Sequence, residues 1–318
     1  MFDQAEHAFA QMLMLLIITA VGYACTRLGY LDFYTKDKLT KLLMNVALPC
    51  MIVASAAGVD AGQIGSQAAL AFALGVLQFF LLLACGHAFA AAFRATGAQR
   101  GTYIIMSTCT NTSFVGIPVA AAIFGDDVTI FCSVFIMAMS LLFFSMGVPL
   151  AAGAGGAAAQ TPRQRVAAGV KAAASPMTFA ALLALVLAAT GVQLPGAVQG
   201  SIQMIGNITA PLTMLIVGVI VSSMRPREFL GELRLYPFIL ICQVIVPLAV
   251  YLALSAVVDD AMILGMFTVM FAMPTGSMAS MFADASGCDE RLAARGTVLS
   301  TLASFPIVPV LVALIAVT

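Results

Sequence analysis

The sequence predicts an all-α membrane protein with ten transmembrane helices, and three observations lead to this class. Of the 318 residues, 62% are hydrophobic and only 9% are charged, whereas a soluble domain has roughly 25% charged residues. Apolar stretches long enough to cross a bilayer, which takes about 20 residues, recur along the chain. Basic residues fall between these stretches in a regular pattern. The formal net charge of zero gives no support for a nucleic-acid partner.

The ten expected spans form two groups of five. The first five cover residues 8–26, 36–57, 66–93, 101–124 and 128–151, and the second five cover 172–190, 198–223, 232–257, 261–283 and 292–316. The stretch 152–171 is rich in Gly and Ala and then becomes basic, as is typical of a loop. We therefore expect a cytoplasmic linker between a first domain (1–151) and a second domain (172–318).

The charged residues predict how the spans are oriented. All fourteen Lys and Arg residues fall in or beside the odd-numbered loops, whereas the even-numbered loops carry acidic residues only. Positively charged loops stay on the cytoplasmic side of a membrane. The pattern therefore predicts a multi-pass protein of the inner (plasma) membrane, with both termini on the outer face and the lipid bilayer as its surroundings.

The second half of the chain aligns on the first without gaps when it is shifted by 162 residues. The shift pairs Gly29 with Gly191, Asn45 with Asn207, Pro49 with Pro211, Gly125 with Gly287 and Asp127 with Asp289. The Asn pair is informative because the chain has only three Asn residues. Since each half has an odd number of spans, the two copies run in opposite directions. This arrangement is an inverted repeat.

Two spans interrupted by polar and helix-breaking residues form the candidate binding region. The fourth span carries STCTNTSFVGIP (107–118) and the ninth carries AMPTGSMAS (272–280). Such residues are tolerated at membrane depth where they line a cavity or are buried, and paired interruptions indicate a transporter's binding site. The alignment sets 112–116 against 274–278. If both helices break there and cross, their unpaired N–H groups and positive helix ends can bind a small carboxylate.

The candidate substrate-binding residues lie at these two breaks. They are Thr110, Asn111, Thr112, Ser113, Pro274, Thr275, Gly276 and Ser277. Residues expected to shape crossovers or kinks are Pro49, Gly116, Pro118, Pro211 and Pro274. The alternative for the hydroxyl groups is that they satisfy the broken backbone and pack the two helices closely. Asn45 and Asn207, each four residues before a proline, either cap backbone groups freed by a kink or face the substrate.

The chemistry that the spans lack narrows the function. None of the fourteen Asp and Glu residues lies deep in a span, which disfavours antiport through a carboxylate relay. The pattern includes no Cys/His cluster for a metal or cofactor, and no nucleophile–His arrangement or paired intramembrane acids for an enzyme. His87 is a candidate for proton coupling, but its place near a span end also fits an interfacial role. The intramembrane amides of Gln78 and Gln243 have no assigned role.

Four stretches resemble the auxin efflux carrier family, which includes plant auxin carriers and bacterial permeases for malonate and similar acids. They are LTKLLMNVALPCMIV (39–53), TNTSFVGIP (110–118), GNITAPLTMLIVG (206–218) and AMPTGSMASMFA (272–283). The second stretch is similar to the plant signature Asn-Pro-Asn-Thr-Tyr. Asn111 and Thr112 match its Asn-Thr, whereas Thr110 stands where that signature has Pro.

The resemblance implies a bile acid symporter-like fold in which helices 4 and 9 are broken and cross. It implies a scaffold domain of helices 1, 2, 6 and 7, and a transport domain of helices 3–5 and 8–10 that moves as an elevator within a homodimer. It also implies that Asn111 contacts a substrate carboxylate. The expected function is secondary-active transport of small organic anions, such as malonate-like or auxin-like acids. The alternatives are a sodium-coupled organic anion symporter and a non-transporting membrane sensor of the same anion.

Overall fold

The computed structural model describes residues 2–58, 64–155, 163, 176–222, 230–276 and 278–317. Among these residues, five helices are long and apolar enough to cross a membrane, namely Gly65–Ala92, Val128–Ala154, Gly196–Ser222, Leu235–Leu254 and Glu290–Ile315. Shorter apolar helices cover Leu13–Arg27, Thr112–Phe124, Pro176–Thr190 and Ala261–Phe271. Most of the expected linker 152–171 lies outside the described residues, although a helix continues into it as far as Gly155.

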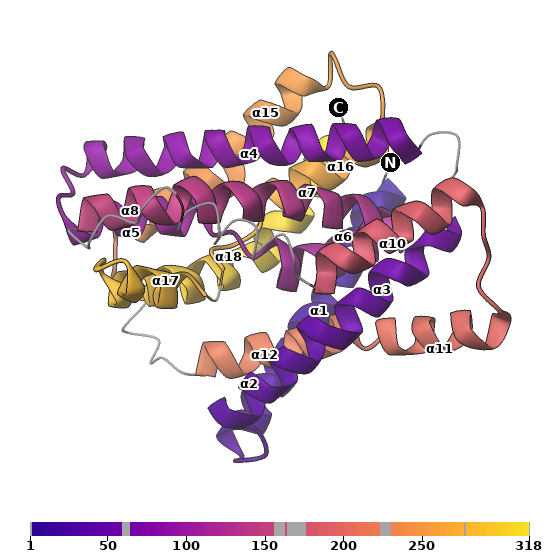
Figure 1. Ribbon diagram of the computed structural model, residues 1–318. Coiled ribbons are helices and arrows are strands. Elements are labelled where there is room, and N and C mark those ends of the chain that lie inside the picture. Colours follow the sequence, from indigo (N-terminus) through magenta and orange to yellow (C-terminus); the bar gives the residue numbers. More distant parts are fainter. Residues whose placement is uncertain are drawn as a thin grey trace.

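The elements follow one another as a chain of helices (Figure 1). The first half contains α1 (Phe2–Arg27), α2 (Phe33–Leu42), η1 (Leu43–Ala47), α3 (Leu48–Ala54), η2 (Ser55–Gly58), α4 (Ile64–Ala92), α5 (Ala98–Thr108), η3 (Thr112–Gly116), α6 (Ile117–Phe124), α7 (Val128–Leu142), η4 (Phe143–Gly147) and α8 (Val148–Gly155). The second half contains α10 (Pro176–Thr190), α11 (Gly196–Gly206), α12 (Thr209–Ser222), α14 (Leu235–Leu240), η5 (Ile241–Ile245), α15 (Val246–Leu254), α16 (Ala261–Phe271), α17 (Ala279–Ala285) and α18 (Glu290–Val317).

Proline residues explain the wide π turns in these helices. The turns η1, η3, η4 and η5 each end two residues before a proline, at Pro49, Pro118, Pro149 and Pro247. A proline inside a helix has no N–H to donate, and its ring clashes with the carbonyl four residues earlier. A wider turn relieves this clash, and π turns are frequent at functional sites. Pro211 occupies a different setting, in the first turn of α12, just after the helix break at Asn207 and Ile208.

The helices pack as two groups. In the first group, α1 packs along α12, and α3 packs against α10 and α11. In the second group, α4 packs against α5 and α7, α5 against α8, and α17 against α18. The groups meet where α1 contacts α18 and where α10 contacts α7. The candidate site lies close to this boundary.

Glycine allows the close approach of α1 and α12. A Cβ added at Gly218 would collide with the backbone carbonyl of Thr19 and lie 2.5 Å from the backbone nitrogen of Tyr23. On the opposite side of the contact, a Cβ at Gly22 would lie 2.5 Å from the carbonyl oxygen of Leu215. Small residues at such contacts let helix backbones pack tightly, which is the usual means of association in a bilayer.

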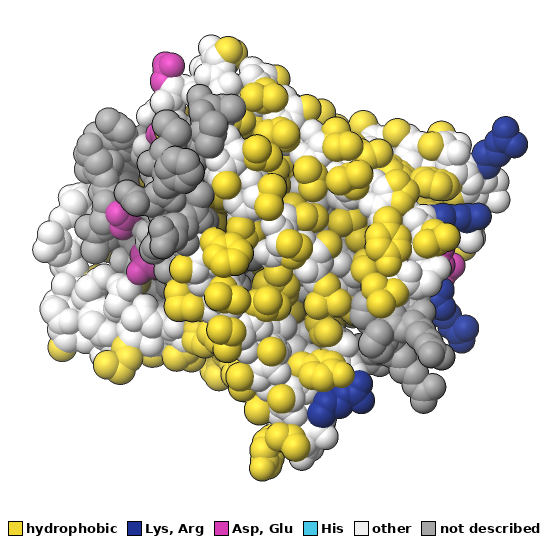
Figure 2. Space-filling view, turned by 180° about the vertical axis from the view of Figure 1, so that it is seen from behind, with side chains coloured by type: hydrophobic (Ala, Val, Ile, Leu, Met, Phe, Trp, Pro, Cys, Tyr) yellow, Lys and Arg dark blue, Asp and Glu magenta, His cyan; other side chains and the backbone are white. Residues whose placement is uncertain are grey.

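The surface of the molecule suits a lipid environment. Figure 2 shows hydrophobic side chains over the middle of one face, with Lys and Arg at one end and most of the visible Asp and Glu toward the other. On α10, for example, Phe179 is 71% exposed and Val186 is 57% exposed. Water-soluble proteins rarely expose apolar patches of this extent.

The Gly218→Ala substitution should destabilise the protein by about 1–3 kcal/mol, since the added methyl group would meet backbone atoms that cannot move aside. Gly200→Ala on α11 is the matched control, because a Cβ there would meet nothing within 4 Å. That control should be neutral or stabilising, since Ala has the higher helix propensity. Thermal unfolding of the purified protein in detergent measures both, and equal effects would contradict the packing argument.

Candidate functional site

Two helix interruptions meet inside the second packing group. Helix α5 ends at Thr108 and the helical backbone resumes at Thr112, while α16 ends at Phe271 and α17 begins at Ala279. The backbone N–H of Asn111 donates to the carbonyl of Pro274 (2.7 Å), and the N–H of Gly276 donates to the carbonyl of Cys109 (2.6 Å). Buried backbone groups need such partners when no helix supplies them.

The contact is centred on different residues from those expected. The alignment of the two halves set 112–116 against 274–278, but the antiparallel bridge joins Thr110 to Thr275. Residues from Thr112 onward are already part of a helical turn, and the backbone hydrogen bonds across the crossing come from Cys109 and Asn111. The paired stretch is therefore the short extended segment before Thr112.

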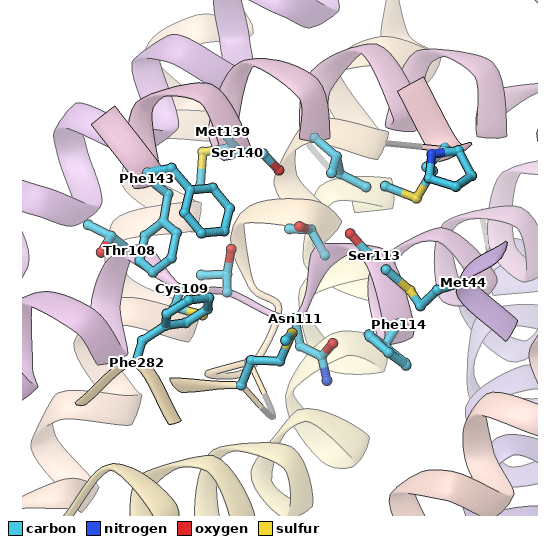
Figure 3. Close-up of a pocket in the computed structure, with 18 of the residues that line it drawn as sticks. Met44, Thr108, Cys109, Asn111, Ser113, Phe114, Met139, Ser140, Phe143 and Phe282 are labelled. Atoms are coloured by element: carbon cyan, nitrogen blue, oxygen red, sulfur yellow. The ribbon is translucent and has the colours of Figure 1, made fainter. Parts of the chain in front are cut away.

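A cavity of about 370 Å³ lies beside this crossing (Figure 3). Its walls come from the crossing segments, from η1, from α7 with η4, and from the start of α10. The lining residues are Met44, Asn45, Thr108, Cys109, Thr110, Asn111, Thr112, Ser113, Phe114, Ile136, Met139, Ser140, Phe143, Phe144, Pro176, Met177, Gly276, Met278 and Phe282. None of these described lining residues carries a charge. The volume falls within the range typical of small-molecule sites.

One wall of the cavity is polar and has unused hydrogen-bonding capacity. Asn111 is only 5% exposed, and its side-chain amide makes no hydrogen bond with any described residue. The hydroxyl groups of Thr112 and Ser113 likewise have no partner among the described residues, and both residues line the cavity. These polar groups are open to the cavity, so they are available to a polar occupant.

The same wall is the start of a helix. No side chain caps this terminus at Asn111, and the N–H groups of Thr112, Ser113 and Phe114 have no acceptor within the helix. A helix N-terminus carries roughly half a positive charge, which favours anions. The cavity can therefore attract an anion through fixed dipoles and neutral donors, without a buried cation.

The opposite wall is apolar and aromatic. The rings of Phe143 and Phe144 each meet the ring of Phe282 edge to face, with centroid separations of 5.2 and 5.5 Å. In Figure 3, Phe143, Phe282 and Met139 lie on one side of the view, and Ser113 and Phe114 lie on the other, with Asn111 between them. A ligand that combines a carboxylate with an apolar body would suit these two walls.

Most of the residues predicted around the first break line the cavity. Thr110, Asn111, Thr112 and Ser113 do so together. Gly116, expected to shape the crossover, ends the π turn η3 and packs against Met270 and Met273. A Cβ at Gly116 would lie 2.7 Å from the sulfur of Met270, so this glycine lets the two interrupted helices approach.

The residues predicted at the second break do not all line the cavity. Gly276 lines the cavity. Pro274 contributes its backbone carbonyl to the crossing. Thr275 lies on the other side of the crossing, where its hydroxyl donates to the carbonyl of Met106 (3.1 Å) and its N–H donates to the hydroxyl of Ser300 (3.1 Å). Ser277 lies outside the described residues.

The two asparagines of the repeated motif also differ. Asn45 lines the cavity from η1 and donates from Nδ2 to the carbonyl of Lys41 (2.7 Å), so it combines a backbone contact with a place on the wall. Asn207 is an exposed residue at the end of α11, and its Oδ1 accepts a hydrogen bond from Gln203 (3.4 Å). Asn207 is not among the cavity's lining residues.

Sequence reasoning missed the aromatic wall. Phe143, Phe144 and Phe282 are ordinary residues of apolar spans, and nothing in their spacing separates them from core side chains. The one local signal in the sequence is Pro149, because the π turn η4 begins at Phe143 and ends two residues before this proline. Met177 and Ser140 reach the cavity only through the packing of α10 and α7.

Comparison with known proteins agrees with the arrangement. A family model described as a membrane transport protein matches residues 7–312, which is nearly the whole chain. Among curated proteins, no match was found. The resemblance inferred from four short stretches is therefore confirmed, and the apolar helices belong to a multi-pass membrane transporter rather than an enzyme. The chain belongs to this membrane transport protein family, the auxin efflux carrier family.

Proposed function

We propose that the protein is a secondary-active transporter of small organic anions, and that the cavity beside the crossing holds the substrate. One observation carries the proposal. The buried amide of Asn111 has no partner among the described residues, and it faces an uncharged cavity at an uncapped helix start. A carboxylate oxygen accepts hydrogen bonds from amide, hydroxyl and backbone N–H groups, so it would satisfy these donors together.

The proposed architecture has ten transmembrane helices in two inverted five-helix repeats, with helices 4 and 9 broken where they cross. The glycines paired by the repeat support it. Gly29 and Gly191 adopt φ angles of +80° and +67°, and Gly125 and Gly287 adopt +94° and +67°. A positive φ is strained for most other residues, so these pairs mark equivalent turns. The antiparallel bridge of Thr110 and Thr275 also suits a two-fold relation between the halves.

The proposed mechanism is elevator-type alternating access. Both packing groups contribute walls to the cavity. The walls from η1 and α10 belong to the first group, and the walls from the crossing, α7 and α17 belong to the second group. Sliding the second group along the first would carry a ligand held at the crossing from one membrane face to the other. We assign the first group to a scaffold and the second to a transport domain, within a homodimer of the inner membrane. The separation of basic from acidic side chains supports placing both termini on the outer face (Figure 2).

The Asn111→Ala variant should lose transport. Removing a hydrogen bond to a charged group costs roughly 1.5–3 kcal/mol, so substrate affinity should fall about 10- to 150-fold. Purified protein in liposomes would be tested for flux of labelled small mono- and dicarboxylates. Asn207→Ala is the control, since it removes the same amide from an exposed residue that does not line the cavity.

Three results would argue against parts of this proposal. Flux that survives unchanged in Asn111→Ala would keep the transporter but remove the site. Equal losses in both Asn variants would indicate a general structural effect. Binding of an acid without flux, in folded protein, would favour a membrane anion sensor over a transporter.

A second candidate function, sodium-coupled symport, is favoured by one further observation. A small cavity of about 10 Å³ lies behind the crossing, and its mainly apolar lining includes the polar residues Thr110, Gln243 and Ser300. Among the described atoms, Oγ1 of Thr110 and Oε1 of Gln243 are buried without a hydrogen-bond partner. The volume holds about one water molecule, and Na⁺ also takes oxygen ligands. Thr110 lines this cavity and the larger one, so an ion here would lie close to the anion.

The dependence of flux on sodium and on membrane potential separates the two functions. Without a counter-ion, transport moves the negative charge of the anion across the membrane. An imposed potential of 100 mV should then change the driving force for transport by about 2.3 kcal/mol per charge. Flux would be measured in liposomes with the potential set by potassium and valinomycin, in sodium or choline buffer. Flux that ignores the potential and requires sodium would select the symporter. Flux that follows the potential equally in both buffers would exclude it.

A further inference from the structure

A third cavity lies away from the crossing, where three helices begin. It has a volume of about 150 Å³ and is formed by the starts of α5, α14 and α18. Three arginines line it, namely Arg234, Arg291 and Arg295, together with the acidic residues Glu232 and Asp289. None of these residues takes part in the proposed transport site.

A buried hydroxyl group lines this cavity without a partner. Tyr103 is 0% exposed, and its hydroxyl makes no hydrogen bond with any described residue. The ring of Tyr103 packs in one cluster with the rings of Phe89 and Phe238, at centroid separations of 6.2 and 5.7 Å. This packing fixes the direction of the hydroxyl group. A buried hydroxyl without a partner is costly, so an acceptor bound in the cavity would be stabilised by this group.

The charges of the cavity favour an anion. Arg295 forms an ion pair with Glu232 (3.4 Å), and Asp289 caps α18 by accepting the N–H of Leu292 (3.0 Å). Both acidic groups therefore have partners already, whereas Arg234 and Arg291 have no ion-pair partner among the described residues. The start of α5 also has no side-chain cap, which adds a partial positive charge.

We propose that this cavity binds a phosphate group, either as inorganic phosphate or in the headgroup of an anionic phospholipid. Planar guanidinium groups match phosphate oxygens in geometry and charge, and the hydroxyl of Tyr103 supplies a further donor. The cavity lies at the beginning of three helices, so an occupant there would tie α5, α14 and α18 together. The ligand acts on a part of the molecule separate from the anion cavity, and the proposal stands whether or not transport is confirmed.

The test measures thermal unfolding of the whole purified protein. Inorganic phosphate is titrated in detergent against chloride at equal ionic strength. In a separate arm, nanodiscs of phosphatidylcholine alone are compared with nanodiscs containing phosphatidylglycerol, in phosphate-free buffer. A ligand that binds only the folded state raises its stability in proportion to the logarithm of the ligand concentration. Stabilisation by inorganic phosphate identifies the free ion, and stabilisation by phosphatidylglycerol alone identifies the lipid headgroup.

Two variants and one control locate the effect. Arg291→Gln removes a charge, and Tyr103→Phe removes only a hydroxyl that has no partner among the described residues, so both should fold normally. Each should weaken binding about tenfold or more, the loss expected for one hydrogen bond to a charged group. Arg100→Gln is the control, because Arg100 is an exposed residue of α5 that does not line the cavity. The affinity of the Arg100→Gln variant for phosphate or phosphatidylglycerol should match that of the unmodified protein.

The proposal is overturned if neither inorganic phosphate nor phosphatidylglycerol stabilises the unmodified protein. It is also overturned if Arg291→Gln and Tyr103→Phe are stabilised as strongly as Arg100→Gln, since the effect would then be a general response to salt or lipid charge. Stabilisation that is lost in both variants and kept in the control supports it.

Discussion

The structure depends on how two interrupted helices satisfy each other's backbone. Interior residues of a membrane protein have no water to hydrogen-bond a broken helix. Here the extended segment around Thr110 pairs with the one around Thr275, and the N–H groups of Asn111 and Gly276 each find a carbonyl across the crossing. The backbone N–H of Asn111 is used in this pairing, whereas its side chain lines the cavity. The pairing therefore shapes one wall of the cavity, and each interruption supplies hydrogen-bond partners for the other.

A cavity built from dipoles has consequences for an anion carrier. A buried arginine or lysine would hold a carboxylate strongly, but removing one partner of a buried ion pair costs several kcal/mol. In the proposed site, hydrogen bonds from Asn111, Thr112, Ser113 and backbone N–H groups would share the charge of the anion among several weaker contacts. Binding of this kind can be favourable enough for entry and weak enough for release, as conduction and transport require. The aromatic wall of Phe143 and Phe282 adds a preference for an apolar body without adding charge.

The two cavities that we propose to bind anions differ in the charge of their walls. The crossing cavity has no charged lining residue among those described, whereas the cavity at the starts of α5, α14 and α18 has three arginines. Charge is tolerated at the ends of the helices because water and lipid headgroups are near, and it is expensive at membrane depth. A strongly charged phosphate therefore suits the cavity at the helix ends, and a small carboxylate suits the uncharged cavity at the crossing.

The sequence by itself determined the class of the protein, and it predicted where the apolar segments lie and where polar residues interrupt them. Low charge content, apolar length and the residues of 107–118 are local properties, and lipid leaves the chain few alternatives to helices. The prolines likewise indicate where helices deviate, as the π turns before Pro49 and Pro118 illustrate. Only the tertiary structure decided which residues meet. The pairing of Thr110 with Thr275 depends on where each helix resumes, and the separation of Asn45 from Asn207 depends on how α3 and α11 pack. Phe143, Phe282 and Met177 reach one cavity from helices far apart in the chain, and no local pattern encodes such a meeting.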